Sequence, residues 1–114
     1  MKKYTLLKIK PGKYKEWEKW CRELNQRKKE GAETLLEENL LRKRCILFNE
    51  GKDAFVVYEH EIMPWKKEKP MNMLKAINKK HHEMLQSLVF IKEGEGMEGK
   101  LGYDFAIESR QKFK

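Results

Sequence analysis

The chain has 114 residues and a net charge of +8; 39% of its residues are hydrophobic and another 39% are charged. These proportions are typical of one globular domain with a single core, and they exclude disordered and fibrous chains. No apolar run approaches the roughly 20 residues needed to cross a bilayer, and the N-terminus passes into strand-like sequence without a signal peptide, so we expect a cytoplasmic protein with no membrane partner.

A strand, a long helix and a second strand are predicted in the first half of the chain. Residues 4–10 mix apolar and polar side chains and end at a Pro-Gly pair, which cannot continue a β-ladder. A helix is predicted over residues 13–38, because its apolar side chains recur at helical spacing, with Asn39 as its left-handed cap. Residues 41–49 then alternate as a second strand.

The second half begins with a hairpin and continues with a helix and a last strand. A turn leads into residues 54–61, which are rich in β-forming side chains. A second helix is predicted from residue 71 to residue 90 or 91, followed by a Gly- and Glu-rich loop over residues 92–100. Residues 101–108 alternate as the last strand, and residues 109–114 are a short basic tail.

The order strand, helix, strand, strand, helix, strand predicts an α+β fold of the ferredoxin-like kind. In this βαββαβ sandwich a four-stranded antiparallel sheet carries both helices on one face, and residues 1–108 form a single domain. Strands two to four carry apolar or aromatic side chains on both faces, so the face without helices would expose a large apolar patch. Because a second copy of the chain would bury that patch, we expect a homodimer.

Two segments resemble the dimeric α/β-barrel proteins. In residues 8–17 a Lys-Pro-Gly sequence and an aromatic residue open a long helix, and residues 55–61 close the hairpin before Trp65 and the second helix. The resemblance implies that two such sheets pair into a dimeric α/β barrel with a pocket between sheet and helices. A more distant likeness, over about residues 10–89, is to the L-rhamnose mutarotases. Relatives in the superfamily include sugar mutarotases, small monooxygenases and haem-degrading enzymes.

One position departs from the mutarotase pattern. Mutarotase-like chains carry a histidine on the first helix, one turn beyond an aromatic residue. When that aromatic residue is aligned with Trp17, Cys21 stands at the place of the histidine. An imidazole transfers protons near neutral pH and an ordinary thiol does so poorly, which argues against mutarotase activity by that route.

His81 is the candidate catalytic residue, because it lies on the apolar stripe of the second helix. An imidazole between helix and sheet can serve as an acid, a base or a ligand. A core histidine that is hydrogen-bonded to a neighbour explains the same position and is the commoner case.

Lys28, Trp17, Tyr58 and His60 are the candidate ligand-binding residues. Lys28 falls near the centre of the apolar stripe of the first helix, where its ammonium group needs an anion, such as Glu59 or Asp104, or open water. A lysine whose stem crosses apolar surface is the alternative. Tyr58 and His60 share one face of the third strand, as the residues of a pocket mouth or of a solvated strand end would. Trp17 belongs to the core, from which its ring could also stack on a sugar or another ring.

No metal and no cofactor are expected. The three histidines do not pair at the i,i+4 spacing of a helical metal site, and Cys21 and Cys45 are expected as reduced thiols. Residues 94–99 match G-x-G-x-x-G, but they follow a helix and lead into a strand, the reverse of the order that dinucleotide binding requires. The basic clusters lie on different predicted elements, which argues against a nucleic-acid surface.

The sequence thus predicts a homodimeric α/β-barrel protein that binds an unidentified small molecule. Two kinds of activity stay open for it, an isomerase or mutarotase type and a monooxygenase type, as does binding without catalysis. In the catalytic form His81 would transfer a proton while Lys28 holds an anionic or hydroxylated group. The alternative is a non-catalytic basic module that binds nucleic acid or acidic partners through its charge.

Overall fold

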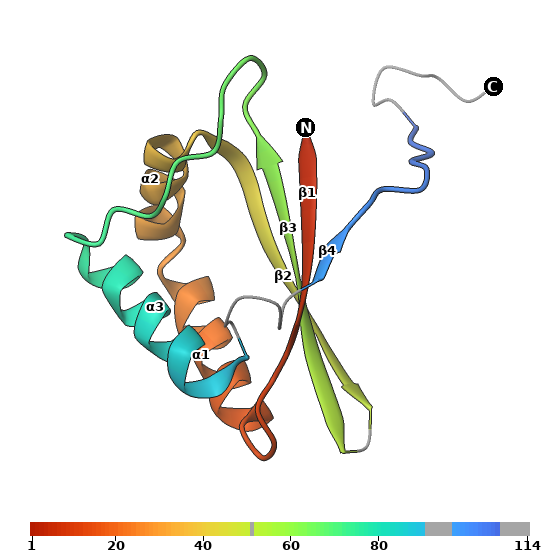
Figure 1. Ribbon diagram of the computed structural model, residues 1–114. Helices are drawn as coiled ribbons and strands as arrows, with labels where there is room; N and C mark the ends of the chain where they lie inside the picture. Colours follow the sequence, from red (N-terminus) through yellow and green to blue (C-terminus); the bar gives the residue numbers. More distant parts are fainter. Residues whose placement is uncertain (51, 91–96, 108–114) are drawn as a thin grey trace.

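The computed structural model describes residues 1–50, 52–90 and 97–107 of the chain. Within these ranges the chain has an α+β fold with one four-stranded sheet and three helices. In chain order the elements are β1 (Lys2–Lys8), α1 (Tyr14–Gln26), α2 (Lys28–Glu38), β2 (Leu40–Glu50), β3 (Asp53–Ile62), α3 (Ala76–Leu88) and β4 (Met97–Gly99). The helices lie together on one face of the sheet (Figure 1).

The sheet is antiparallel, with the strand order β2-β3-β1-β4. Strand β3 is central and pairs with both β1 and β2, so that Cys45 of β2 stands opposite Tyr58 of β3. Side chains alternate between the two faces of a strand. Tyr58 and His60 therefore face the helices, while Val57 and Glu59 face away from them.

The core lies between the helices and the sheet. Trp17 and Trp20, three residues apart on one face of α1, are 0% and 2% exposed and belong to the same cluster as Val56 of β3. Ile9, just after β1, forms a bridge with Val89, just after α3, and closes one end of the core. Burial of side chains of this size contributes about 1.5–3 kcal/mol each.

The helix predicted over residues 13–38 is wrong as a single element, because the structure divides it. Helices α1 and α2 meet at Arg27, whose backbone has φ −112° and ψ 39°. Residues 25–31 contain no large apolar side chain, so packing against the sheet does not hold this stretch to one helical axis. The left-handed cap at Asn39 is confirmed, with φ 59°. Helix α3 begins at Ala76, later than predicted, because a turn precedes it.

The strand predicted over residues 101–108 is also wrong. Strand β4 comprises only Met97–Gly99, paired with β1, and residues 101–107 have no regular secondary structure. The alternating apolar side chains of this segment are all exposed: Leu101, Tyr103, Phe105 and Ile107. An alternating pattern makes a strand only where a neighbouring strand receives its backbone hydrogen bonds. The basic tail predicted over residues 109–114 lies outside the described residues.

The sheet face away from the helices is partly apolar. Ile46 and Phe48 of β2 are 42% and 48% exposed. They stand opposite Val57 and Phe55 of β3, so the four side chains form one patch on the open face. Apolar groups gathered in this way commonly mark an interaction surface.

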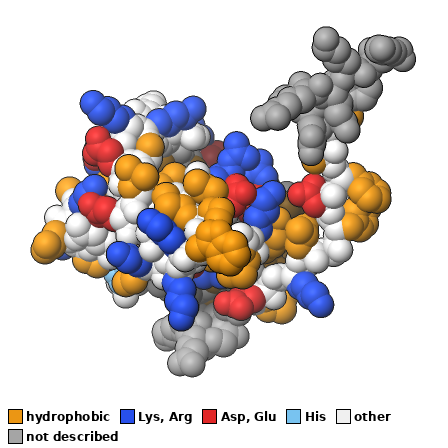
Figure 2. Space-filling model, turned by 90° about the horizontal axis from the view of Figure 1, so that it is seen from above, with side chains coloured by type: hydrophobic (Ala, Val, Ile, Leu, Met, Phe, Trp, Pro, Cys, Tyr) orange, Lys and Arg blue, Asp and Glu red, His pale blue; other side chains and the backbone are white. Residues whose placement is uncertain are grey.

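Basic side chains are spread over the surface. In the view of Figure 2, Lys and Arg side chains occupy several separate places among acidic and hydrophobic ones. Some are paired, such as Arg22 with Glu18 and Lys80 with Glu23. The charge therefore does not form a single block on the face shown. No helix in the described part of the chain is both long and apolar enough to cross a membrane.

Candidate functional site

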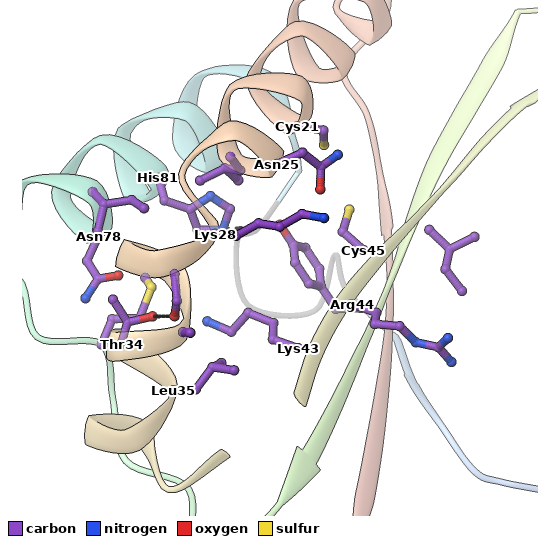
Figure 3. A pocket seen from close by; sticks show the side chains of 17 residues that line it. Cys21, Asn25, Lys28, Thr34, Leu35, Lys43, Arg44, Cys45, Asn78 and His81 are labelled. Carbon is purple, nitrogen blue, oxygen red and sulfur yellow. Dashed lines mark hydrogen bonds between the residues drawn. The ribbon is translucent and has the colours of Figure 1, made fainter. Parts of the chain in front are cut away.

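An open pocket of about 480 Å³ lies between the helices and the strands β2 and β3 (Figure 3). A second hollow of about 440 Å³ lies beside it and is bordered by residues 68–71, in the segment that links β3 to α3. Lys43, Tyr58, Met71 and His81 line both hollows. The two hollows therefore meet at these side chains.

The larger pocket exists because α2 presents small side chains to it. Gly31, Ala32 and Thr34 line the pocket, and a Cβ atom added to Gly31 would meet nothing within 4 Å. Helix α1, in contrast, fills its part of the space between the layers with Trp17 and Trp20. The bend between the two helices thus separates a packed half of the interior from an open half.

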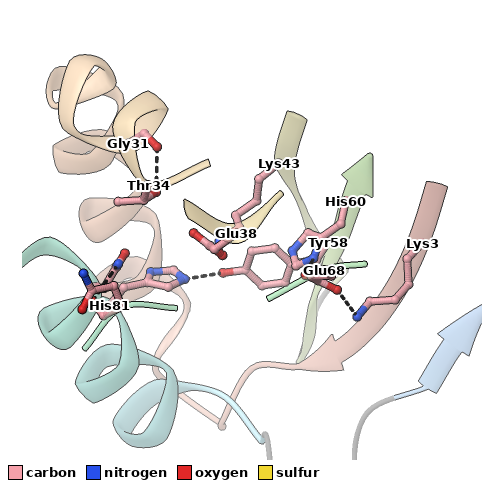
Figure 4. Close-up of polar contacts among 11 residues, drawn as sticks. Lys3, Gly31, Thr34, Glu38, Lys43, Tyr58, His60, Glu68 and His81 are labelled. Atoms are coloured by element: carbon pink, nitrogen blue, oxygen red, sulfur yellow. Dashed lines mark hydrogen bonds and ion pairs between the residues drawn. The ribbon is translucent and has the colours of Figure 1, made fainter. Parts of the chain in front are cut away.

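His81 of α3 is held by two hydrogen bonds. The indole Nε1–H of Trp20 donates to Nδ1 of His81 at 2.8 Å. On the other side of the ring, Nε2 of His81 lies 3.2 Å from the hydroxyl oxygen of Tyr58 (Figure 4). Because an indole N–H can only donate, Nδ1 is the unprotonated nitrogen, and the neutral ring carries its proton on Nε2. Burial, helped by the positive charge of Lys43, lowers the pKa of His81 to about 4, so the ring is neutral near pH 7.

Tyr58 of β3 accepts the hydrogen bond from His81 and keeps its own O–H free to donate within the pocket. Burial above all raises the pKa of Tyr58 well above its usual value, so the phenol stays protonated. The Tyr58 hydroxyl is thus a neutral donor whose oxygen is held by the Nε2–H of His81, and it is well suited to bind an acceptor atom of a ligand.

Two ammonium groups extend into the pocket (Figure 3). Lys43 of β2 donates to the carboxylate of Glu38, which is 2% exposed, at 2.9 Å. Lys28, in the first turn of α2, lines the larger pocket. No Asp or Glu side chain is among the described residues that line this pocket. The larger pocket is therefore positively charged.

The anions expected for Lys28 are paired with other cations. Glu59 lies on the opposite face of the sheet and accepts a hydrogen bond from Nε of Arg44 at 3.0 Å. Asp104 lies 3.6 Å from the ammonium group of Lys2. Lys28 forms no ion pair with any described residue, so its charge faces water or a ligand.

His60 lines the second hollow but not the larger pocket. Its Nδ1 lies 2.7 Å from one oxygen of Glu68, and Lys3 donates to the other oxygen at 2.7 Å (Figure 4). Burial lowers the pKa of His60, against the opposing effect of Glu68. Burial by itself raises the pKa of Glu68, but hydrogen bonds from Lys3 and His60 outweigh burial and bring this pKa below its usual value. The three side chains tie the segment after β3 to the sheet.

Two free thiols, Cys21 of α1 and Cys45 of β2, point toward each other at the wall of the larger pocket (Figure 3). Each is half-buried. A hydrogen bond between the two sulfurs lowers the pKa of Cys45 and raises that of Cys21. As the pH rises, Cys45 is therefore the thiol that loses its proton first, while Cys21 stays protonated.

The structure brings together four of the five residues that the sequence predicted for the site. Lys28, Tyr58 and His81 line the larger pocket, and His60 joins Tyr58 and His81 in the second hollow. Trp17 lines neither hollow. It is fully buried, with its ring centroid 5.9 Å from that of His81, and it supports that ring from the core.

Sequence reasoning missed several charged residues of the two hollows, among them Lys43, Glu38 and Glu68. Lys43 could have been found, because it alternates with Cys45 on the side of β2 that faces the helices. The sequence around Glu38 and Glu68 contains no pattern that predicts a place for either side chain in a hollow. Glu38 becomes buried only because the end of α2 packs on the sheet, and Glu68 follows β3 in an irregular segment.

Within residues 1–50, 52–90 and 97–107, no group of three or more His, Cys, Asp or Glu side chains is arranged to hold a metal ion. What the arrangement offers is a positive charge, a phenol donor and a pair of thiols around one open space. Such a set can bind and orient an anionic or hydroxylated molecule.

Comparison with known proteins places the chain in a family but gives it no activity. No curated protein and no solved structure matches the chain. Residues 3–105 match DUF6176, which is described as a family of unknown function. Because the match extends over most of the sequence, the chain belongs to the DUF6176 family.

Proposed function

We propose that this protein binds a small molecule in the larger pocket between its helices and its sheet. The observation that carries the proposal is the ammonium group of Lys28, which extends into the pocket without an ion pair among the described residues. The Tyr58 hydroxyl adds a free donor on the sheet side. The pocket volume of about 480 Å³ lies within the range of about 300–1,000 Å³ that is common for such sites.

The lining of the pocket favours a ligand with an anionic or hydroxylated group at one end. Lys28 and Lys43 supply positive charge, and Tyr58 supplies a neutral donor. Apolar side chains such as Leu24 and Ile77 would contact the rest of the molecule. Recognition would then combine a few polar contacts with apolar packing, as small-molecule sites usually do.

Catalysis by His81 has less support than binding. Its Nδ1 accepts from Trp20 and its Nε2–H is engaged with Tyr58, so no lone pair of the ring is free to take a proton from a ligand. Isomerase or monooxygenase chemistry through His81 would require the ring to leave one of these bonds. We therefore propose binding as the function. Proton transfer by His81, with Lys28 holding an anionic or hydroxylated group, is the catalytic form, and it requires one of these two hydrogen bonds to open.

We further propose that the chain has a ferredoxin-like fold and forms a homodimeric α/β barrel. The strand order β2-β3-β1-β4 with the helices on one face supports the fold. The exposed Ile46 and Phe48 on the open face support the dimer, because a second copy would bury them. The distant likeness to the L-rhamnose mutarotases is part of this proposal, and Cys21 is the position that argues against their chemistry.

A second candidate is a non-catalytic basic module that binds nucleic acid or acidic partners, and it is based on the net charge of +8. The spread of basic side chains in Figure 2 gives it less support than the pocket gives to a small molecule. A salt titration of binding to DNA and RNA separates the two candidates, because a binder of this kind loses affinity steeply as salt rises.

The proposal is tested with a thermal-shift screen of small anionic and hydroxylated compounds, followed by two matched variants. Compounds that occupy the pocket raise the Tm of the wild type. The shift should be smaller for Lys28→Met and unchanged for Lys29→Met, whose exposed side chain is not among the residues that line the pocket. Equal shifts for the two variants, or no stabilising compound in the screen, would contradict the proposal.

A further inference from the structure

The pair Cys21 and Cys45 is not explained by the binding of an anionic ligand. Cys21 comes one helical turn after Trp17, so the two side chains lie on the same face of α1. Cys45 stands directly opposite Tyr58 in the β2–β3 ladder, with both side chains on the helix side of the sheet. Cys45 therefore lies where the indole, the second thiol and the phenol come together.

A chain of hydrogen bonds with a single direction ends at Tyr58, which stands directly opposite Cys45 in the β2–β3 ladder. Trp20 donates to His81, and His81 donates to the oxygen of Tyr58, at 2.8 Å and 3.2 Å. When no ligand accepts from it, the Tyr58 O–H can donate to the sulfur of Cys45 opposite it in the ladder. Every donor in this chain points toward the sulfur, so the chain favours negative charge there.

Trp17 supplies a further donor. Its Nε1–H is fully buried and has no hydrogen-bond partner among the described residues. A buried N–H without a partner is costly in a resting protein and favours the appearance of negative charge nearby. The pKa of Cys45 is lowered first by the Cys21 thiol, against the effect of burial, and then by the Trp17 indole and the Tyr58 hydroxyl.

We propose that Cys45 and Cys21 are a peroxide-reactive thiol pair at the wall of the pocket, with Cys45 as the attacking thiolate and Cys21 as the resolving thiol. The reactant class is a small hydroperoxide, which can enter through the open pocket that both cysteines line. This proposal does not depend on the identity of the ligand.

The chemistry has two steps. The Cys45 thiolate attacks one oxygen of the peroxide, the O–O bond breaks, and a sulfenic acid forms while the other oxygen leaves and takes a proton. Cys21 then attacks the sulfenic sulfur, a disulfide forms, and the hydroxyl group leaves as water with the proton of Cys21. In total the two thiols are oxidised by two electrons and hydrogen peroxide is reduced to two molecules of water.

The product would join α1 to β2 at the wall of the pocket. Because α1 and β2 are otherwise held by packing, the bond fixes their distance on this side. Ligand binding would then depend on the redox state of the pair. Only this last consequence rests on the proposed function.

The test is oxidation by hydrogen peroxide of the wild type, Cys21→Ser and Cys45→Ser, followed by intact mass spectrometry. The wild type is expected to lose two hydrogen atoms, and peptide mapping should show the Cys21–Cys45 bond. Cys21→Ser should stop at a sulfenic acid on Cys45 that dimedone traps. Cys45→Ser should react at least about tenfold more slowly. Equal rates for the two single variants, or oxidation of the wild type without the disulfide, would overturn the proposal.

A second test separates activation of Cys45 from mere accessibility. Tyr58→Phe removes the donor beside Cys45, so the rate of reaction with a small aromatic disulfide should reach half its maximum at a higher pH than in the wild type. Tyr103→Phe, at a residue that is 77% exposed and remote from the pocket lining, is the matched control. An unchanged midpoint in Tyr58→Phe, with circular dichroism showing a folded protein, would mean that the phenol does not activate the thiol.

Discussion

The indole of Trp20 donates its only proton to Nδ1 of His81, at 2.8 Å. This contact decides the chemical form of the histidine, because a nitrogen that accepts from an indole cannot itself carry a proton. The proton therefore sits on Nε2, where it meets the oxygen of Tyr58. Trp20, a residue of the core, thereby fixes His81 as the donor to Tyr58 and leaves the Tyr58 hydroxyl as the group that can donate into the pocket.

Burial is the main cause of the low pKa of His81, about 4, and replacement of Trp20 by Phe should raise this pKa above that value while burial keeps it below the ordinary value near 6.5. The change frees Nδ1 and removes a donor that opposes protonation of the ring. A titration of the His81 ring protons followed by NMR measures the shift. Cavity formation at a position 2% exposed should also cost about 1–3 kcal/mol of stability. An unchanged pKa in a folded variant would contradict the role given to Trp20.

The protein should lose stability as the pH falls from about 6.5 to about 4. The pKa of His81 is about 4 in the folded state, against 6.5 in the unfolded chain, so the unfolded state binds more protons in this window. The stabilisation is complete above pH 6.5 and is lost at about pH 4, and it amounts to about 3 kcal/mol at most.

Chemical denaturation at several pH values, for the wild type and for His81→Gln, measures this contribution. His60, whose pKa is also lowered mainly by burial, contributes with the same sign, so His60→Gln is measured alongside. The slope of stability against pH should fall in His81→Gln. The same slope in that variant as in the wild type would contradict the assignment.

Lys43→Met should destabilise the protein by about 3 kcal/mol, because it leaves the carboxylate of Glu38 buried without its cation. The double variant Lys43→Met/Glu38→Gln should recover part of this loss, since the remaining buried group is neutral. Urea denaturation measures both changes. A double variant that is less stable than Lys43→Met would show that the buried charge is not the cause.

Phe48→Asp should convert a dimer into a monomer, because it places a charge within the apolar patch of the open sheet face. Sedimentation velocity gives the mass, and far-UV circular dichroism checks the fold. Lys79→Glu, on the exposed surface of α3, is the control and should stay dimeric. A wild type that sediments as a monomer at all concentrations would remove the dimer from the proposal.

The order of the elements could be predicted because each carries its own pattern. The Pro-Gly pair ends the first strand, and the alternation of residues 54–61 defines the third. The break at Arg27 could not be predicted, because residues 25–31 include good helix formers and only tertiary packing decides the direction of the axis. The segment 101–107 shows the opposite case, a strand pattern without a neighbouring strand to pair with.

The site was predictable only where a residue type conflicts with its position. Lys28 and His81 fall on the apolar stripes of the predicted helices, where a charged or polar side chain is unusual, and both line the larger pocket. The pair of Glu38 and Lys43 joins the end of a helix to a strand, so it depends on how α2 packs on the sheet. The hydrogen bond from Trp20 to His81 spans 61 residues of sequence and leaves no trace in local periodicity.

The most direct test of ligand binding in the larger pocket is an NMR titration of the labelled protein with the best compound from the screen. If the ligand binds in the larger pocket, the largest shifts fall on Lys28, Tyr58 and His81, while the fully exposed Trp65 ring stays unchanged. Shifts confined to the open sheet face, at residues such as Ile46 and Phe48, would contradict the claim that the pocket binds the ligand.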